Sequence, residues 1–269
     1  MNASDEITLE SDALIEWLRT RAAEPPSAWP VAAWAGDTTV GRVRAQNEDR
    51  WGVADGWLFG VADGIGGRPG GAIAAESVIQ ALRVVTAQAF DADFDAVIRF
   101  LNDTVLAAGA TSGTPGLGTT LAALALRDSY ASVFSIGDSR VYRWRDGELL
   151  QLTVDHSLRT ELLEAGVDPV EYAERGMRVD ALTAFVGMPA DRDLPRSAGA
   201  FRIAQNDRFL ICSDGVHGYV DPSEIARLVG SSAPADAVGG LLHAANANGG
   251  RDNATAIIVQ IGPARAPQE

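Results

Sequence analysis

Short apolar runs bounded by turn residues recur along most of the chain and predict β-strands. Each covers about four to eight residues and stops at glycine, aspartate, asparagine or another polar residue. Asp55-Gly56, between the first two runs, is a strong hairpin signal and predicts that these two strands pair antiparallel. The expected strands are 50–54, 57–62, 119–126, 131–136, 141–145, 149–153, 208–213 and 254–261.

Other stretches repeat apolar residues at the three- and four-residue spacing of an amphipathic helix. Segments 72–90 and 94–108 do so after the first hairpin, and a short helix is expected at 157–166 within a polar, loop-like region reaching about 179. Asp221-Pro222-Ser223-Glu224 is a capping box that opens a helix, and a further helix covers 234–247. Hairpin-linked strands with two pairs of helices predict an α+β fold, a central antiparallel β-sandwich with helices on its outer faces.

The first 35 residues have a different pattern and are expected to form an N-terminal extension. Residues 12–21 place Leu14, Trp17 and Leu18 on one side of a short helix, which the three prolines of EPPSAWP then end. From residue 36 to 269 there is neither a long linker nor an internal repeat, which predicts one domain.

The charge balance restricts the kinds of partner. With 22 basic and 36 acidic residues, a net charge of −14 repels a phosphate backbone, so we expect no nucleic-acid binding. The same charge suits a protein that gathers divalent cations, although a solvated acidic surface also produces it. The single cysteine, Cys212, excludes an internal disulfide. With no signal-peptide pattern and no apolar run of about 20 residues, a cytoplasmic protein away from membranes is expected. We also expect a monomer.

Carboxylates recur at the ends of the predicted strands. In VADGIGGRPGG an apolar strand stops at Asp63, and two further strands run into Asp138 and Asp214, while Asp252 directly precedes the last strand. A single Asp-Gly is usually just a turn. Because the end of one antiparallel strand lies beside the start of its neighbour, however, four such carboxylates can meet at one edge of the sheet. That arrangement favours a site for hard cations such as Mg²⁺ or Mn²⁺.

The hairpin register supports the same interpretation. If Asp55-Gly56 is a two-residue loop, Ala54 pairs with Trp57 and Glu48 lies opposite Asp63, unless a bulge shifts the register. Like charges directly opposite each other are destabilising, so a cation between them is expected.

Arg44 is the basic exception near these acidic positions. It is either a surface arginine paired with Glu48 or Asp49, or a guanidinium that binds two oxygens of a phosphoryl group. The spacing alone does not choose between the two.

Seven short motifs in order resemble the metal-dependent protein serine/threonine phosphatases of type 2C, in their bacterial form. The resemblance covers about residues 36–261 and implies the β-sandwich, a binuclear Mn²⁺/Mg²⁺ centre and hydrolysis of phosphoserine and phosphothreonine by a metal-bound water. It also implies phosphorylated protein substrates and an opposing Ser/Thr kinase in signalling. The motifs are RAQNED (44–49), VADGIGG (61–67), GTT (118–120), GDSR (137–140), LTVDHS (152–157), CSDG (212–215) and DNAT (252–255).

The resemblance also assigns roles to individual positions. Asp63 bridges both metal ions and the Gly64 carbonyl completes one coordination shell, while Asp214 and Asp252 hold the other ion. Glu48 and Asp49 contact the metals directly or through water. Arg44 binds the phosphate.

Three positions depart from the family pattern. Gly218 replaces an aspartate that would support a weaker third metal together with Asp138, so the third ion is in doubt. Ala184 replaces an arginine near the flap (about 157–180), and Ile65 follows the first Asp-Gly. The leaving-group acid is therefore unidentified; His156 is a candidate, against a structural role beside Asp155, and His217 and His243 are taken as structural.

Two other functions remain open at this stage. One is a catalytically silent sensor or scaffold that keeps the sandwich, although such a protein would be expected to lose Asp63, Asp214 or Asp252, and all three are present. The other is an enzyme for small phosphate esters.

Overall fold

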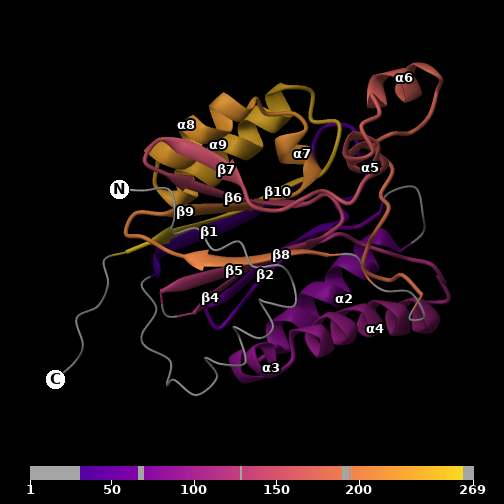
Figure 1. Cartoon of the computed structure of the whole chain (residues 1–269), viewed down its shortest axis with the longest axis horizontal. Helices are drawn as coiled ribbons and strands as arrows, with labels where there is room; N and C mark the ends of the chain where they lie inside the picture. Colours follow the sequence, from indigo (N-terminus) through magenta and orange to yellow (C-terminus); the bar gives the residue numbers. More distant parts are fainter. Residues whose placement is uncertain (1–30, 66–69, 128, 190–193, 195, 263–269) are drawn as a thin grey trace.

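Two antiparallel β-sheets stack face to face and helices cover their outer surfaces (Figure 1). This computed structural model describes residues 31–65, 70–127, 129–189, 194 and 196–262. One sheet has the strand order β1-β10-β9-β6-β7 and the other β2-β3-β4-β5-β8. The α+β sandwich expected from the sequence is therefore confirmed.

The strands pair so that residues far apart in the chain become neighbours, and the side chains between the sheets are apolar. Phe59, Phe209 and Ile257 are fully buried there. The first sheet comprises β1 (Val31–Thr39), β10 (Ala254–Ile261), β9 (Arg208–Cys212), β6 (Arg140–Arg145) and β7 (Glu148–Gln151). The second comprises β2 (Asp49–Ala54), β3 (Leu58–Asp63), β4 (Leu121–Arg127), β5 (Tyr130–Ile136) and β8 (Ser197–Arg202).

Each sheet is covered by its own group of helices, and a separate segment with two short helices lies at one end of the sandwich (Figure 1). The second sheet is covered by α2 (Gly71–Val84), α3 (Ala87–Ala92) and α4 (Phe94–Ser112). The first sheet is covered by α7 (Asp214–His217), α8 (Pro222–Ser231) and α9 (Pro234–Ala247). The separate segment contains α5 (Leu158–Glu164) and α6 (Pro169–Glu174). In the described ranges, the helices are all too short or too polar to cross a membrane.

Local sequence signals were less informative at the weakly apolar elements. The sheet begins at Val31, five residues inside the predicted extension of 1–35, because the edge strand β1 pairs along β10 while leaving much of its surface exposed. The strand β8, with the sequence SAGAFR, has too little hydrophobic character to be predicted. The helix proposed for residues 12–21 lies outside the described residues.

Helix 72–90 was predicted as one element, but the structure divides it into α2 and α3. Val85 takes an extended conformation, and the hydroxyl of Thr86 then accepts a hydrogen bond from the Ala89 N–H to begin α3. α6 was also missed; the Asp168 side chain caps it, and Pro169 stands at its first position.

The first hairpin determines which residues face each other at the site. Asp55 and Gly56 both have positive φ and form the turn, across which the Trp57 N–H donates to the Ala54 carbonyl at 3.0 Å, but the ladder pairs Ala54 with Leu58. Trp57 is therefore an extra, bulged residue in the pairing of β3 with β2. Its carbonyl accepts from the Leu126 N–H at 2.8 Å, and its buried indole packs edge-on against Phe90, with ring centroids 5.6 Å apart. The predicted register was therefore wrong by one residue, and Asp49 rather than Glu48 lies opposite Asp63.

Candidate metal centre

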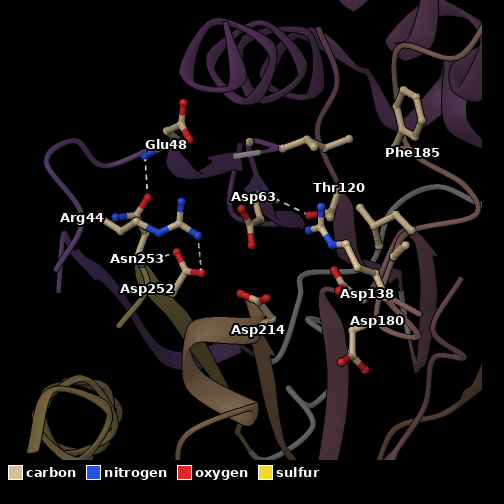
Figure 2. Close-up of a pocket in the computed structure, with 15 residues that line it drawn as sticks. Arg44, Glu48, Asp63, Thr120, Asp138, Asp180, Phe185, Asp214, Asp252 and Asn253 are labelled. Atoms are coloured by element: carbon tan, nitrogen blue, oxygen red, sulfur yellow. Dashed lines mark hydrogen bonds and ion pairs between the residues drawn. The ribbon is translucent and has the colours of Figure 1, made fainter. Parts of the chain in front are cut away.

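The acidic strand ends meet in one pocket at the edge of the sandwich (Figure 2). The pocket has a volume of about 520 Å³ and draws its lining from both sheets and the connecting loops. Asp63 ends β3, and Asp214 follows β9. Asp138 lies between β5 and β6, and Asp252 just precedes β10. The structure thus brings together the four carboxylates that the sequence placed at strand ends.

Asp63 is positioned by the two threonines of the GTT motif. The Asp63 N–H donates to Thr120 Oγ1 at 2.9 Å. Its carbonyl accepts from Thr119 Oγ1 and from the Thr120 N–H, both at 2.8 Å. Burial, reinforced by the charges of Asp49 and Asp214, raises the pKa of the Asp63 carboxyl well above its usual range. A bound cation would stabilise the charged form of this carboxylate.

Asp49 lies behind the pocket and links three strands. Its side chain is 1% exposed, and Oδ2 accepts hydrogen bonds of 2.7 Å from Ser213 Oγ and Thr255 Oγ1. These hydroxyls belong to residues adjoining β9 and within β10, beside Asp214 and Asp252. Burial raises the pKa of Asp49 to about 6. Its hydroxyl partners could not be identified from the sequence because they are distant in the chain.

The two Asp-Gly pairs at the pocket, Asp63-Gly64 and Asp214-Gly215, occur where two backbones approach closely. A Cβ at Gly215 would lie 1.8 Å from the Asn253 carbonyl oxygen, and one at Gly64 would lie 2.4 Å from the Gly71 backbone. These distances leave room only for glycine. The glycines therefore allow Asp214 to sit beside the start of β10 and Asp63 to sit beside the start of α2.

Arg44 contacts a different carboxylate from the two considered from sequence. Its Nη2 donates to Asp252 Oδ2 at 2.7 Å, whereas Glu48 and Asp49 had been considered as partners (Figure 2). The hydrogen bond to Asp252 raises the pKa of Arg44. A guanidinium therefore already neutralises one of the acidic groups of the pocket.

Asn253 holds the loop that carries Arg44 and Glu48, a role that was missed from sequence. Its Oδ1 accepts from the Glu48 N–H at 2.8 Å, and Nδ2 donates to the carbonyls of Val40 and Gln46 at 3.0 and 2.9 Å. The DNAT motif was the available signal, but its asparagine acquires this function only once β10 lies beside the loop.

The chemistry of these side chains fits hard divalent cations. The acidic groups offer only oxygen atoms, and Oδ1 of both Asp49 and Asp214 is buried without a hydrogen-bond partner among the described residues. Within that part of the chain, no three His, Cys, Asp or Glu groups are already arranged to hold one ion. The Asp252 carboxylate, one of the candidate ligands, is paired with Arg44.

His156 and Gly218 do not add to the acidic groups of the pocket. His156 is outside the described pocket lining; its Nδ1 lies 3.2 Å from the Gly137 carbonyl, and burial lowers its pKa. Asp155, considered as its partner, instead forms a two-pronged contact with Arg140 at 2.9 and 2.7 Å. Gly218 has no side chain to place beside Asp138, whose pKa is raised to about 7 chiefly by burial.

An oxygen-rich acidic pocket at the edge of the two-sheet sandwich suits a metal-dependent hydrolase that acts on phosphate esters. The model of the protein phosphatase 2C family matches residues 41–252, and the chain belongs to this family of protein serine/threonine phosphatases.

Named relatives agree with this assignment. Protein phosphatase PhpP of Streptococcus pneumoniae serotype 2 is 33% identical over 239 residues, covering 83% of this chain and 95% of the relative. Serine/threonine phosphatase stp of Listeria monocytogenes serovar 1/2a is 32% identical over 240 residues, covering 83% and 93%. The solved catalytic domain of the phosphatase PstP, in complex with two manganese ions, superposes with a TM-score of 0.73 and 28% identity, covering 86% and 98%.

Proposed function

We propose that this chain hydrolyses phosphoserine and phosphothreonine in proteins with two Mn²⁺ or Mg²⁺ ions bound in the acidic pocket. The observation that carries the proposal is the convergence of Asp63, Asp138, Asp214 and Asp252 with Arg44 in one pocket. The manganese ions named for the PstP structure support the choice of cation.

The residues divide into those that hold cations and those that bind phosphate. Asp63 and the Gly64 carbonyl would hold one ion, and Asp214 and Asp252, together with Asp63, would hold the second. Glu48 and Asp49 would act directly or through water, and Asp138 alone would favour only a weak third ion. When bound, such cations acidify water and neutralise charge on a phosphoryl group.

Arg44 would change partners when the substrate enters. Because Asp252 is needed for the cations, its ion pair with Arg44 opens, and the released guanidinium can donate to two phosphoryl oxygens. His156 contacts the Gly137 backbone and is not proposed as the leaving-group acid.

Phosphorylated proteins of a Ser/Thr kinase pathway, or the kinase itself, are the proposed substrates of a monomeric enzyme. A silent scaffold is the less favoured alternative, because Asp63, Asp214 and Asp252 are all retained in the pocket.

The decisive variant is Asp214→Asn, which keeps the size of the side chain but removes a charged oxygen ligand. We expect Mn²⁺-dependent hydrolysis of p-nitrophenyl phosphate and of a phosphothreonine peptide to fall at least about 100-fold, the scale on which catalytic metals act. Asp236→Asn, at an exposed position in the first turn of α9, is the matched control and should retain activity. Equal turnover by the wild type in EDTA would reject the mechanism.

A further inference from the structure

A second arginine lines the same pocket from a different segment of the chain. Among the described lining residues, the basic side chains are Arg44 and Arg178, and Arg44 is held by Asp252. Arg178 follows α6 and is exposed. Within the described part of the chain it forms no ion pair, so its guanidinium can bind an incoming anion.

The backbone around Arg178 is fixed although its side chain is exposed. The Arg178 carbonyl accepts from the Ala181 N–H at 3.0 Å, closing a turn. Next to it, the Val179 carbonyl accepts from the Arg159 N–H at 2.6 Å, and the Val179 side chain is only 3% exposed. These contacts hold the base of the Arg178 side chain at the pocket, which reduces the entropy lost on binding a ligand.

The acidic residue nearest to Arg178 along this segment is already neutralised. Asp180 also lines the pocket, but its carboxylate accepts from Arg159 Nε at 2.7 Å. The turn therefore presents one carboxylate that is paired and one guanidinium that is not.

The formal charge of the pocket indicates which anion the Arg178 guanidinium would bind. Because Asp180 is paired with Arg159, five other lining carboxylates face two guanidiniums, and two divalent cations would bring the formal charge to only about +1. A phosphate monoester is a dianion, and the planar fork of arginine matches its oxygens. We propose that Arg178 binds the phosphoryl group of the substrate, and the inorganic phosphate product, as a second guanidinium beside Arg44; this rests on the proposed phosphatase function.

The test compares Arg178→Ala and Arg178→Lys with Arg175→Ala at saturating Mn²⁺. Arg175 is an exposed arginine of the same segment that contacts Tyr172 and is outside the described pocket lining, which makes it the matched control. For Arg178→Ala we expect KM for p-nitrophenyl phosphate and the inhibition constant of inorganic phosphate both to rise about tenfold, the scale of one charge-assisted hydrogen bond. The turnover number should stay within about threefold, Arg178→Lys should be intermediate, and Arg175→Ala should match the wild type.

Other outcomes separate this inference from the phosphatase proposal. An unchanged phosphate inhibition constant in Arg178→Ala overturns it, as does a rise of KM that is confined to phosphopeptides, which would place Arg178 against the polypeptide. If the wild type shows no Mn²⁺-dependent hydrolysis, the proposed function fails. Titration calorimetry of inorganic phosphate with Mn²⁺ then tests Arg178 independently: weaker binding by Arg178→Ala supports its role, and equal binding overturns it.

Discussion

The buried carboxylate groups at this site are positioned by neutral hydrogen-bond donors. Few basic residues compensate their negative charge. Asp49 accepts from two hydroxyls, and the Asp63 backbone bonds to threonines. Burial is the largest cause of the raised pKa of Asp49, Asp63, Asp138 and Asp214 alike. Keeping these buried carboxylates charged is therefore electrostatically unfavourable, and bound cations would reduce that free-energy cost.

His217 gives a pH dependence that can be isolated from these carboxylates. Its Nε2 lies 3.0 Å from the Asp138 carbonyl, and burial lowers its pKa to about 4. The ordinary pKa of histidine is about 6.5. Between about pH 4 and pH 6.5, His217 therefore binds a proton in the unfolded chain but not in the folded chain. The contribution of His217 to the free energy of unfolding is thus present above pH 6.5 and is lost as the pH falls towards 4, by at most about 3 kcal/mol.

Urea unfolding in EDTA from pH 4.5 to 7.5 measures this contribution. His217→Gln keeps a hydrogen-bond donor but cannot titrate, so its stability should decline less on acidification than that of the wild type. His243→Gln, at an exposed position of α9, should leave the wild-type slope unchanged. Parallel pH profiles for the wild type and His217→Gln would contradict the prediction.

At the scale of elements, strand ends and the turns that follow them position the acidic groups. Asp63 and Asp214 each lie at the end of a buried strand, and the glycine after each permits a neighbouring backbone to come close. The short helix α7 begins at Asp214 and is joined to β10 through that approach. Packing between elements, rather than local turn propensity, therefore requires these glycines.

Gly215→Ala tests this reason for the glycine. The added Cβ would meet the Asn253 carbonyl, which belongs to backbone and cannot rotate away, so we expect the free energy of unfolding to fall by about 3 kcal/mol or more. Gly239→Ala, in α9 with open space at its Cβ, should instead stabilise the protein by about 0.5–1 kcal/mol. Urea denaturation of both variants measures the contrast, and a Gly215→Ala variant as stable as the wild type would refute it.

At the scale of the whole molecule, the pocket joins the two sheets. Asp63 comes from the second sheet, whereas Asp214 and Asp252 adjoin strands of the first. Cations bound between them would link the two halves of the sandwich and reduce the repulsion of a chain with net charge −14. Metal binding should therefore be visible as global stabilisation.

Thermal unfolding checks this without measuring activity. Mn²⁺ at about 100 times its Kd stabilises a native state by about 2.7 kcal/mol, which corresponds to a rise in Tm of about 5–10 °C for a domain of this size. Asp214→Asn should lose most of that rise, and NaCl at the same ionic strength should not reproduce it. Equal shifts with NaCl, or in the variant, would show general screening rather than a specific site.

The elements with strong local patterns, and the acidic residues at their ends, could be predicted from the order of residues alone. The helix at 234–247 and the strand at 254–261 have the predicted bounds, because their apolar periodicity and their end signals coincide. The ordered motifs also identified the family, since each motif is a run of adjacent residues. Weakly apolar β1 and β8 lacked such local signals and depend on their neighbours.

Contacts between groups that are distant in the chain became known from the folded structure and could not be predicted. The extra residue Trp57 after the turn shifted the hairpin register and placed Asp49, rather than Glu48, opposite Asp63. Long-range contacts paired Arg44 with Asp252 and brought Arg178 to the same pocket. Local periodicity carries no information about such pairs, because their energies arise only when folding brings separate segments together.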